Sequence, residues 1–279
     1  MSRAAIGNKV VMRSGTRVLP LLHWRHGLIL LGALFASVAW ASGPGDPTGG
    51  TLSPLATLVR WVPFILKGFG LNLVISVFAM AVGTLLGVAV GLMQISRRGA
   101  IRGPAWFVTH LFRNSPWIVI LFVVMNLLPF EIPWPDGGTV LIPPWLPAAF
   151  AFSLPIMANV SEIVRGAVNS IPHGQWESGE SLAFSRGQVL RWVILPQCIR
   201  RSLPPWMNWY ALLTLATPIA SIVGVQESLG NVHAAMEAAG GRPDLLMPFY
   251  LFLLCLFFAY IYPIAIFTRR LENRYGFIS

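Results

Sequence analysis

Six long apolar runs constrain the fold of this chain more than any other feature of its sequence. They lie at 28–41, 68–95, 116–130, 139–161, 203–226 and 245–268. A helix needs about 20 apolar residues to cross the hydrocarbon core of a bilayer, and most of the runs approach or exceed that length. The first and third are shorter, so each of these spans is expected to extend into its flank. The sequence predicts an all-α integral membrane protein with about six transmembrane helices.

The distribution of charge supports this fold and gives it an orientation. Only 11% of the 279 residues are charged, yet the net charge is +10. Most basic residues precede the first run, separate the second from the third and the fourth from the fifth, or follow the sixth. With six spans, the loops on the other side of the membrane contain only three basic residues, Arg60, Lys67 and Arg242. Cytoplasmic loops are enriched in Lys and Arg, so both termini and the segment 166–201 are expected to be cytoplasmic, with no basic patch left for nucleic acid.

The N-terminal segment 1–50 combines a basic start, the first apolar run and a linker rich in Gly and Pro. Ala39-Trp40-Ala41 before Ser42 could be the cleavage site of a signal peptide. A retained signal-anchor helix is the favoured interpretation. Residues 1–50 are thus expected to be an added segment, and 51–279 the main membrane domain.

The stretch 55–66 leaves two alternatives open. It is apolar, with Arg60 and Trp61 in its middle. Trp is enriched at headgroup depth, so one interpretation is an interfacial helix lying on the outer leaflet. The other is plain packing along the helix bundle.

Small and charged residues predict contacts of two later spans. Gly83, Gly87 and Gly91 lie four residues apart on one helix face, which allows close packing. Packing within the chain is favoured over contact with a partner chain. Glu162 and Arg165 are three apart near the end of the fourth span and are expected to pair.

A polar, amphipathic block at 162–201 separates the fourth and fifth apolar runs. The pattern from residue 175 predicts a short helix, in which Gly179 and Ala183 share a face nearly bare of side chain. A second helical piece runs from Arg186 and is expected to stop at Pro196. A helix–turn–helix between membrane spans, with one small-residue face, is typical of a surface to which another protein docks.

This block resembles the EAA loop of ABC-importer permeases. That family's pattern is Glu-Ala-Ala, three residues, Gly, nine residues and Ile-x-Leu-Pro, and the spacing is kept by 177–179 (Glu-Ser-Gly), Ala183 and 193–196 (Val-Ile-Leu-Pro). Ser178, Gly179 and Ala183 depart from the pattern but remain small. The flanks resemble the polar amino-acid subfamily, which comprises histidine, glutamine, arginine and opine importers, and the resemblance covers 68–276.

The resemblance implies one set of site residues, and the few polar residues along the apolar route suggest a second. Those implied for coupling to an ATPase are Glu177, Ser178, Gly179, Leu182, Ala183, Ser185 and Pro196. Those expected along the substrate pathway are Asn72, Asn114, Ser115, Asn159, Thr217, Pro218 and Ser221. The second set is uncharged, and Leu215-Ala216 and Ile120 replace a Lys-Asp pair and a Gln of the family. Because an unpaired buried ion costs several kcal/mol, a neutral amino acid or similar solute is expected in preference to arginine, lysine or glutamate.

The chain lacks the signs of chemistry of its own. It has no G-x-x-x-x-G-K-[ST] loop for ATP, its five histidines show no metal-ligand spacing, and its two cysteines suggest no bridge. We therefore expect a non-enzyme without cofactor or metal, with ATP and Mg²⁺ bound by a partner ATPase.

The implied function is that of the permease subunit of an ABC importer, which moves amino acids or amino-acid-like polar solutes across the bacterial inner membrane by alternating access. The implied partners are an ABC ATPase dimer, a second permease chain, a periplasmic substrate-binding protein and membrane lipid. The binding protein would meet outer loops that include Glu131, Asp136 and 227–244. A membrane-embedded enzyme or a channel subunit is the alternative, although an enzyme should show titratable groups converging at mid-membrane.

Overall fold

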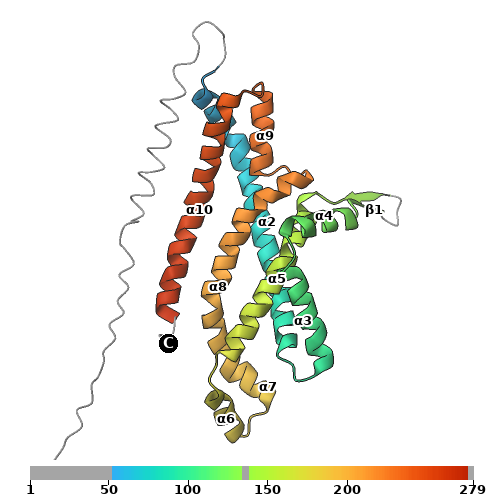
Figure 1. Ribbon diagram of the computed structural model, residues 1–279, viewed down its shortest axis with the longest axis vertical. Coiled ribbons are helices and arrows are strands. Elements are labelled where there is room, and N and C mark those ends of the chain that lie inside the picture. The colour runs from blue at the N-terminus through green and yellow to red at the C-terminus, as the bar shows by residue number, and fades with distance from the viewer. Residues whose placement is uncertain (1–51, 134–137, 276–279) are drawn as a thin grey trace, which may run out of the picture.

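The computed structural model describes residues 52–133 and 138–275 (Figure 1). Within these, three helices are long and apolar enough to cross a membrane: α2 (Pro54–Gln94), α5 (Trp145–Asn169) and α10 (Leu246–Tyr275). Two bent helix pairs raise the number of spans to as many as five. The predicted helical membrane fold is confirmed, with a short two-stranded sheet as an addition. The predicted span at 28–41 lies outside the described residues.

Helix α2 absorbs the stretch 55–66. It starts at Pro54, where the Ser53 hydroxyl accepts a hydrogen bond from Ala56 N at 3.3 Å, and it runs unbroken to Gln94. Leu58 and Ile65 are buried in a cluster that includes residues of α9 (Ser228–Ala238) and α10. The interpretation of this stretch as a helix on the outer leaflet was therefore wrong, and packing along the bundle is confirmed.

Helices α2 and α5 pack closely along the glycine stripe. A Cβ added at Gly83 would lie 2.6 Å from Ile156 Cγ2, and one at Gly87 would lie 2.7 Å from Val160 Cβ. A Cβ at Gly91 would lie 2.8 Å from the Ser161 carbonyl oxygen. The stripe thus serves contact within the chain, as predicted.

The third predicted span is two helices. α3 (Gly99–Arg113) and α4 (Trp117–Leu127) meet at an angle of 107°. The break falls at 114–116, where the Ser115 hydroxyl turns back to the Leu111 carbonyl at 2.6 Å and Pro116 cannot donate to a continuing helix. The third span therefore extends from the run 116–130 into the basic segment before it, as its short length predicted, but across a sharp bend.

An antiparallel hairpin follows α4. Strand β1 (Glu131–Pro133) pairs with β2 (Thr139–Leu141), and both are exposed. The predicted fourth span loses its first residues to this hairpin and begins at Trp145, directly after Pro143 and Pro144.

A nearly continuous helical rod leads from the polar block into the fifth span. Its pieces are α7 (Arg186–Val189), a π-helical turn (Leu190–Ile194), α8 (Leu195–Ala216) and a 3-10 segment (Thr217–Val223). The prediction that Pro196 stops the helix was wrong. The π turn directly before it widens the helix, which accommodates a ring and a missing N–H that an ideal α-helix would not.

The last helices of the chain are α9, η3 (Pro243–Leu245) and α10, and α10 packs along α8. η3 and α9 precede and flank the start of α10. The Tyr210 and Tyr260 hydroxyls hydrogen-bond at 2.7 Å between α8 and α10. Figure 1 shows α9 beside the start of α2 at one end of the molecule, with α7 and the short helix α6 (His173–Ser181) at the other.

Candidate coupling segment and solute pathway

Helix α6 ends in a hydrogen-bonded reversal of the chain. Phe184 N donates to the Gly179 carbonyl at 3.2 Å and Ala183 N to the Glu180 carbonyl at 2.9 Å, which is the Schellman pattern. Such a cap needs a residue in the left-handed region, and Ala183 occupies it with φ 61°. Glycine suits that conformation best, so the backbone explains why the family pattern has Gly at this position.

Gly179 faces this chain's own α7. It is the buried residue of α6, and a Cβ built on it would lie 2.7 Å from Val189 Cγ2. Ala183 lies beyond the end of the helix. The two residues therefore do not form the shared bare face that the sequence predicted, because the cap turns Ala183 away and Val189 fills the space over Gly179.

The outward surface of this segment is apolar at its tip. Leu182 is 70% exposed and Phe184 is 43% exposed, while Glu177 and Ser178 are also exposed. Ser185 caps α7 through a reciprocal pair of hydrogen bonds with Gln188. Phe184 was not among the predicted coupling residues, although its position as an apolar side chain within a polar block could have indicated a contact surface.

Trp176 fixes α6 to the rest of the chain. Its ring packs against the buried cluster of Ala167, Val168, Ile171, Val189, Ile194 and Cys198. The Arg186 guanidinium lies 5.2 Å from the centre of the same ring, a cation–π distance. Helix α6 is thus exposed on one side and packed on the other against a buried cluster, which includes residues of α7 and α8.

Two of the predicted pathway residues belong to the interior of the chain. Asn72 and Thr217 are fully buried, and Asn72 Nδ2 donates to Thr217 Oγ1 at 2.9 Å and to Glu227 Oε2 at 2.7 Å. Asn72 Oδ1 accepts from Ser228 N at 3.0 Å. Their polar atoms are occupied within the core, so in this structure they do not line a passage.

Glu227 is the centre of that buried network. It has no exposed surface, and its carboxylate caps α9 by accepting from the Leu229 and Gly230 amides, each at 3.0 Å. The expectation that Glu227 lies in an outer loop open to a binding protein was therefore wrong. Burial of a carboxylate requires several donors. Three of them are local, from Ser228, Leu229 and Gly230. The fourth, Asn72, lies 155 positions away, so no local pattern reveals that Glu227 is buried.

Asn159 is the predicted pathway residue that borders a cavity. The cavity has a volume of about 410 Å³, and its lining includes Arg113, Asn159, Glu162, Ser170, Arg201 and Trp209. Asn159 Nδ2 donates to the Pro155 carbonyl at 2.8 Å. Asn114 and Ser115 lie at the α3–α4 break, while Pro218 and Ser221 lie half-buried in the 3-10 segment, so the structure does not gather the predicted set in one place.

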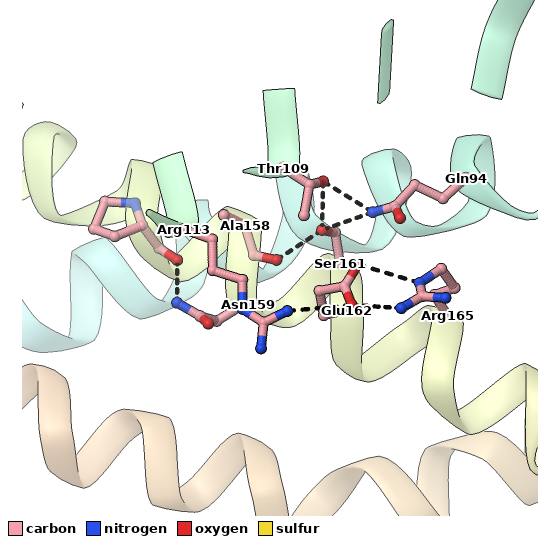
Figure 2. Close-up of polar contacts among 9 residues, drawn as sticks. Gln94, Thr109, Arg113, Ala158, Asn159, Ser161, Glu162 and Arg165 are labelled. Carbon is pink, nitrogen blue, oxygen red and sulfur yellow. Dashed lines mark hydrogen bonds and ion pairs between the residues drawn. The ribbon is translucent and has the colours of Figure 1, made fainter. Parts of the chain in front are cut away.

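Glu162 brings charge to this cavity, whereas the predicted pathway residues are all uncharged. The predicted Glu162–Arg165 pair is confirmed at 2.6 Å, and Arg113 approaches the same carboxylate at 3.4 Å (Figure 2). Arg201 donates to the Ser170 carbonyl and hydroxyl at 2.7 and 2.8 Å. Glu162 is the only carboxylate among the described lining residues, and it is paired with two guanidinium groups.

A second polar cluster includes Ser161, the residue directly before Glu162 on α5. Gln94 Nε2 donates to Thr109 Oγ1 at 2.8 Å and to Ser161 Oγ at 3.1 Å, joining α2, α3 and α5 (Figure 2). The Thr109 and Ser161 hydroxyls are 2.9 Å apart. All three side chains are buried, so the cluster ties the three helices together beside the charged cavity.

Comparison with known proteins identifies the family to which the chain is similar. Residues 83–276 match the family described as binding-protein-dependent transport system inner membrane component. The probable amino-acid ABC transporter permease protein YckA of Bacillus subtilis (strain 168) is 34% identical over 215 residues, which cover 77% of this chain and 90% of YckA. The octopine transport system permease protein OccM of Rhizobium meliloti is 34% identical over 197 residues, or 68% of this chain and 79% of OccM.

Solved structures show the same fold. The crystal structure of an amino acid ABC transporter with histidines matches with a TM-score of 0.66 at 23% identity, covering 79% of this chain and 99% of that one. An inward-facing MetNI methionine ABC transporter matches with a TM-score of 0.57 at 17% identity, covering 80% and 98%. The family match spans more than half of the chain, and its sequence relatives are ABC transporter permeases. The chain therefore belongs to the family of inner membrane components of binding-protein-dependent transport systems, and is a permease subunit of an ABC transporter.

Proposed function

We propose that this permease imports amino acids or amino-acid-like polar solutes by alternating access driven by a separate ATPase. One observation carries the proposal: the exposed helix α6 leads through a tight cap into the helical rod 186–223. A displacement of α6 can therefore pass into α8 without crossing a flexible loop. α8 also borders the cavity at Asn159, through Pro205 and Trp209.

The proposed ATPase contact is the tip of the coupling segment. Leu182 and Phe184 offer exposed apolar side chains, with the Glu177 carboxylate and the Ser178 hydroxyl on neighbouring exposed positions. An apolar centre with a polar rim is the usual anatomy of a protein interface. An ABC ATPase dimer would bind ATP and Mg²⁺, and the present chain would supply no cofactor.

Two further partners complete the proposal. A second permease chain, identical or different, would close the pathway, and a periplasmic binding protein would deliver the solute to the end of the molecule that carries α9. By the positive-inside rule, the coupling segment with its excess of arginine would face the cytoplasm. The chain itself would lie in the bacterial inner membrane.

The charges around the cavity at Asn159 disfavour a solute with a net positive charge. YckA is named as an amino-acid permease and OccM as an octopine permease, which supports an amino-acid class of solute. The Glu162 carboxylate is already shared by Arg113 and Arg165. A cationic side chain would find no unpaired carboxylate among the described lining residues, and an unpaired buried ion is costly.

Reconstitution tests the proposal. The full-length permease is purified together with its ATPase and placed in proteoliposomes with its binding protein. Uptake is then compared for a neutral, a cationic and an anionic amino acid. We expect ATP-dependent uptake with the neutral amino acid as the best substrate. Failure of an ATPase subunit to copurify, or uptake that needs no ATP, would contradict the transport mechanism. Preference for a charged amino acid would contradict only the substrate class.

A further inference from the structure

A large basic cavity lies beside the coupling segment, separate from the cavity at Asn159. It has a volume of about 1140 Å³. One wall is formed by the end of α2, the corner at 95–97 and the start of α3. The opposite wall is formed by α6 and α7, and the end of α5 closes the inner side. The cavity therefore lies between the corner that connects α2 to α3 and the helix α6, which is proposed to contact the ATPase.

The charged lining of this cavity has an excess of positive charge. Its arginines are Arg97, Arg102, Arg165 and Arg186, against the carboxylates of Glu177 and Glu180. Arg165 is paired with Glu162. Arg97 and Arg102 are exposed and form no ion pair within the described part of the chain. Two guanidinium groups are thus available to a ligand.

Helix α3 adds a second feature that favours an anion at the same corner. The helix begins at Gly99, and no side chain caps its first amides. Free N–H groups and the helix dipole favour negative charge at such an end. The N-terminus alone would not define a site, but here it coincides with Arg97 and Arg102.

Beyond the cavity, α3 presents an apolar surface. Trp106, which also lines the cavity, is 56% exposed, Phe107 is 63% exposed and Leu111 is 47% exposed. In a membrane, Trp favours headgroup depth and the other two side chains favour acyl chains. Guanidinium groups at one end of this surface and apolar side chains along it match the two ends of a phospholipid.

We propose that this cavity binds the phosphate of an anionic phospholipid of the cytoplasmic leaflet, with the acyl chains along Trp106, Phe107 and Leu111. Basic pockets between helices on the cytoplasmic side bind such headgroups through the same electrostatics. The net positive lining favours an anionic lipid over a zwitterionic one. Because α6 and α7 form the opposite wall, a bound lipid restrains the coupling segment. The inference rests on the membrane orientation proposed above and needs neither the ATPase nor the solute.

The experiment measures lipid binding to the full-length chain in an uncharged detergent at about 0.15 M salt. Dihexanoyl-phosphatidylglycerol is titrated by calorimetry, with dihexanoyl-phosphatidylcholine and inorganic phosphate as comparison ligands. We expect phosphatidylglycerol to bind at least ten times more tightly than either. Equal binding of phosphatidylcholine would overturn the preference for an anionic lipid. Equal binding of inorganic phosphate would assign the site to a free anion and overturn the lipid.

Charge variants locate the site. Arg97→Gln with Arg102→Gln should weaken phosphatidylglycerol binding by about tenfold or more, from roughly 1 kcal/mol for each basic residue. The matched control is Arg269→Gln with Arg270→Gln, which removes the same charge from the exposed end of α10, outside the cavity. The control should change binding by less than about twofold, because distant exposed charges are screened. Equal losses in the two variants would overturn the proposed location.

Hydrogen exchange tests the link to the coupling segment. Phosphatidylglycerol should slow amide exchange across 173–190 in the wild type and in the α10 control, and should leave it unchanged in the Arg97→Gln, Arg102→Gln variant. Binding of the lipid with no change in the exchange of α6 and α7 would show that this cavity does not restrain the coupling segment. None of these measurements depends on transport, so they can fail while the proposed function holds.

Discussion

Gly179 on α6 lies directly against Val189 on α7, so closely that an added Cβ would sit 2.7 Å from Val189 Cγ2. The contact sets the distance between the exposed helix and the rod that leads into the membrane. The small residue at position 179 is therefore needed by this chain's own fold, whatever it also contributes to a partner.

The first prediction tests that contact. Gly179→Ala should push α6 away from α7, because such overpacking costs about 1–3 kcal/mol. We expect substrate-stimulated ATP hydrolysis of the assembled complex to fall at least fivefold, with normal membrane insertion. Val189→Ala in the same chain should restore most of it by removing the clashing methyl groups. Absence of rescue by Val189→Ala would mean that Gly179 acts through the ATPase surface instead.

Ala183 offers a stabilising substitution. Its φ of 61° costs an L-residue roughly 1–2 kcal/mol that glycine avoids. Ala183→Gly should therefore stabilise the cap of α6 by about 1 kcal/mol and slow amide exchange in α6 about fivefold. Ser181→Gly, within the helix, is the control and should speed exchange, since glycine disfavours helix interiors. Faster exchange in Ala183→Gly would contradict the argument from backbone strain.

Glu162 should govern which charges the permease tolerates. Glu162→Gln leaves Arg113 and Arg165 without their shared carboxylate, so the excess of positive charge at the Asn159 cavity grows. The ratio of glutamate to glutamine uptake should then rise at least tenfold, measured with the same binding protein at the same concentration. Glu131→Gln, on the exposed hairpin, removes the same charge and should leave the ratio unchanged. An unchanged ratio in Glu162→Gln would separate this cavity from the solute pathway.

The α2–α5 contact should be the most sensitive to added volume. Gly87→Leu places a side chain where even a Cβ would meet Val160 at 2.7 Å. The yield of folded, monodisperse protein should drop sharply, as expected for overpacking of a close helix pair. Gly70→Leu is the control on the same helix, because nothing lies within 4 Å of its added Cβ. Size-exclusion profiles of the two variants in one detergent provide the measurement, and equal yields would contradict the structure.

The sequence alone determined the features that depend on local length and spacing. The apolar runs predicted the helical membrane fold, since any segment of that length and hydropathy is more stable in a bilayer than in water. The spacing from Glu177 to Pro196 predicted the coupling segment, and the three-residue spacing of Glu162 and Arg165 predicted their pair. The glycine stripe of α2 predicted close packing, because small side chains permit it wherever a partner helix lies.

Only the tertiary structure decided which partners these segments meet. Asn72 and Thr217 were predicted as pathway residues. In the structure the Asn72 amide donates both to Thr217 and to Glu227, which lies 155 positions from it. The Asn159 cavity acquired charge because the bend after α3 brings Arg113 to Glu162. Gly179 turned inward because α7 folds back over it. Burial and hydrogen-bond satisfaction depend on which distant segments come together, and no local period in the sequence records that choice.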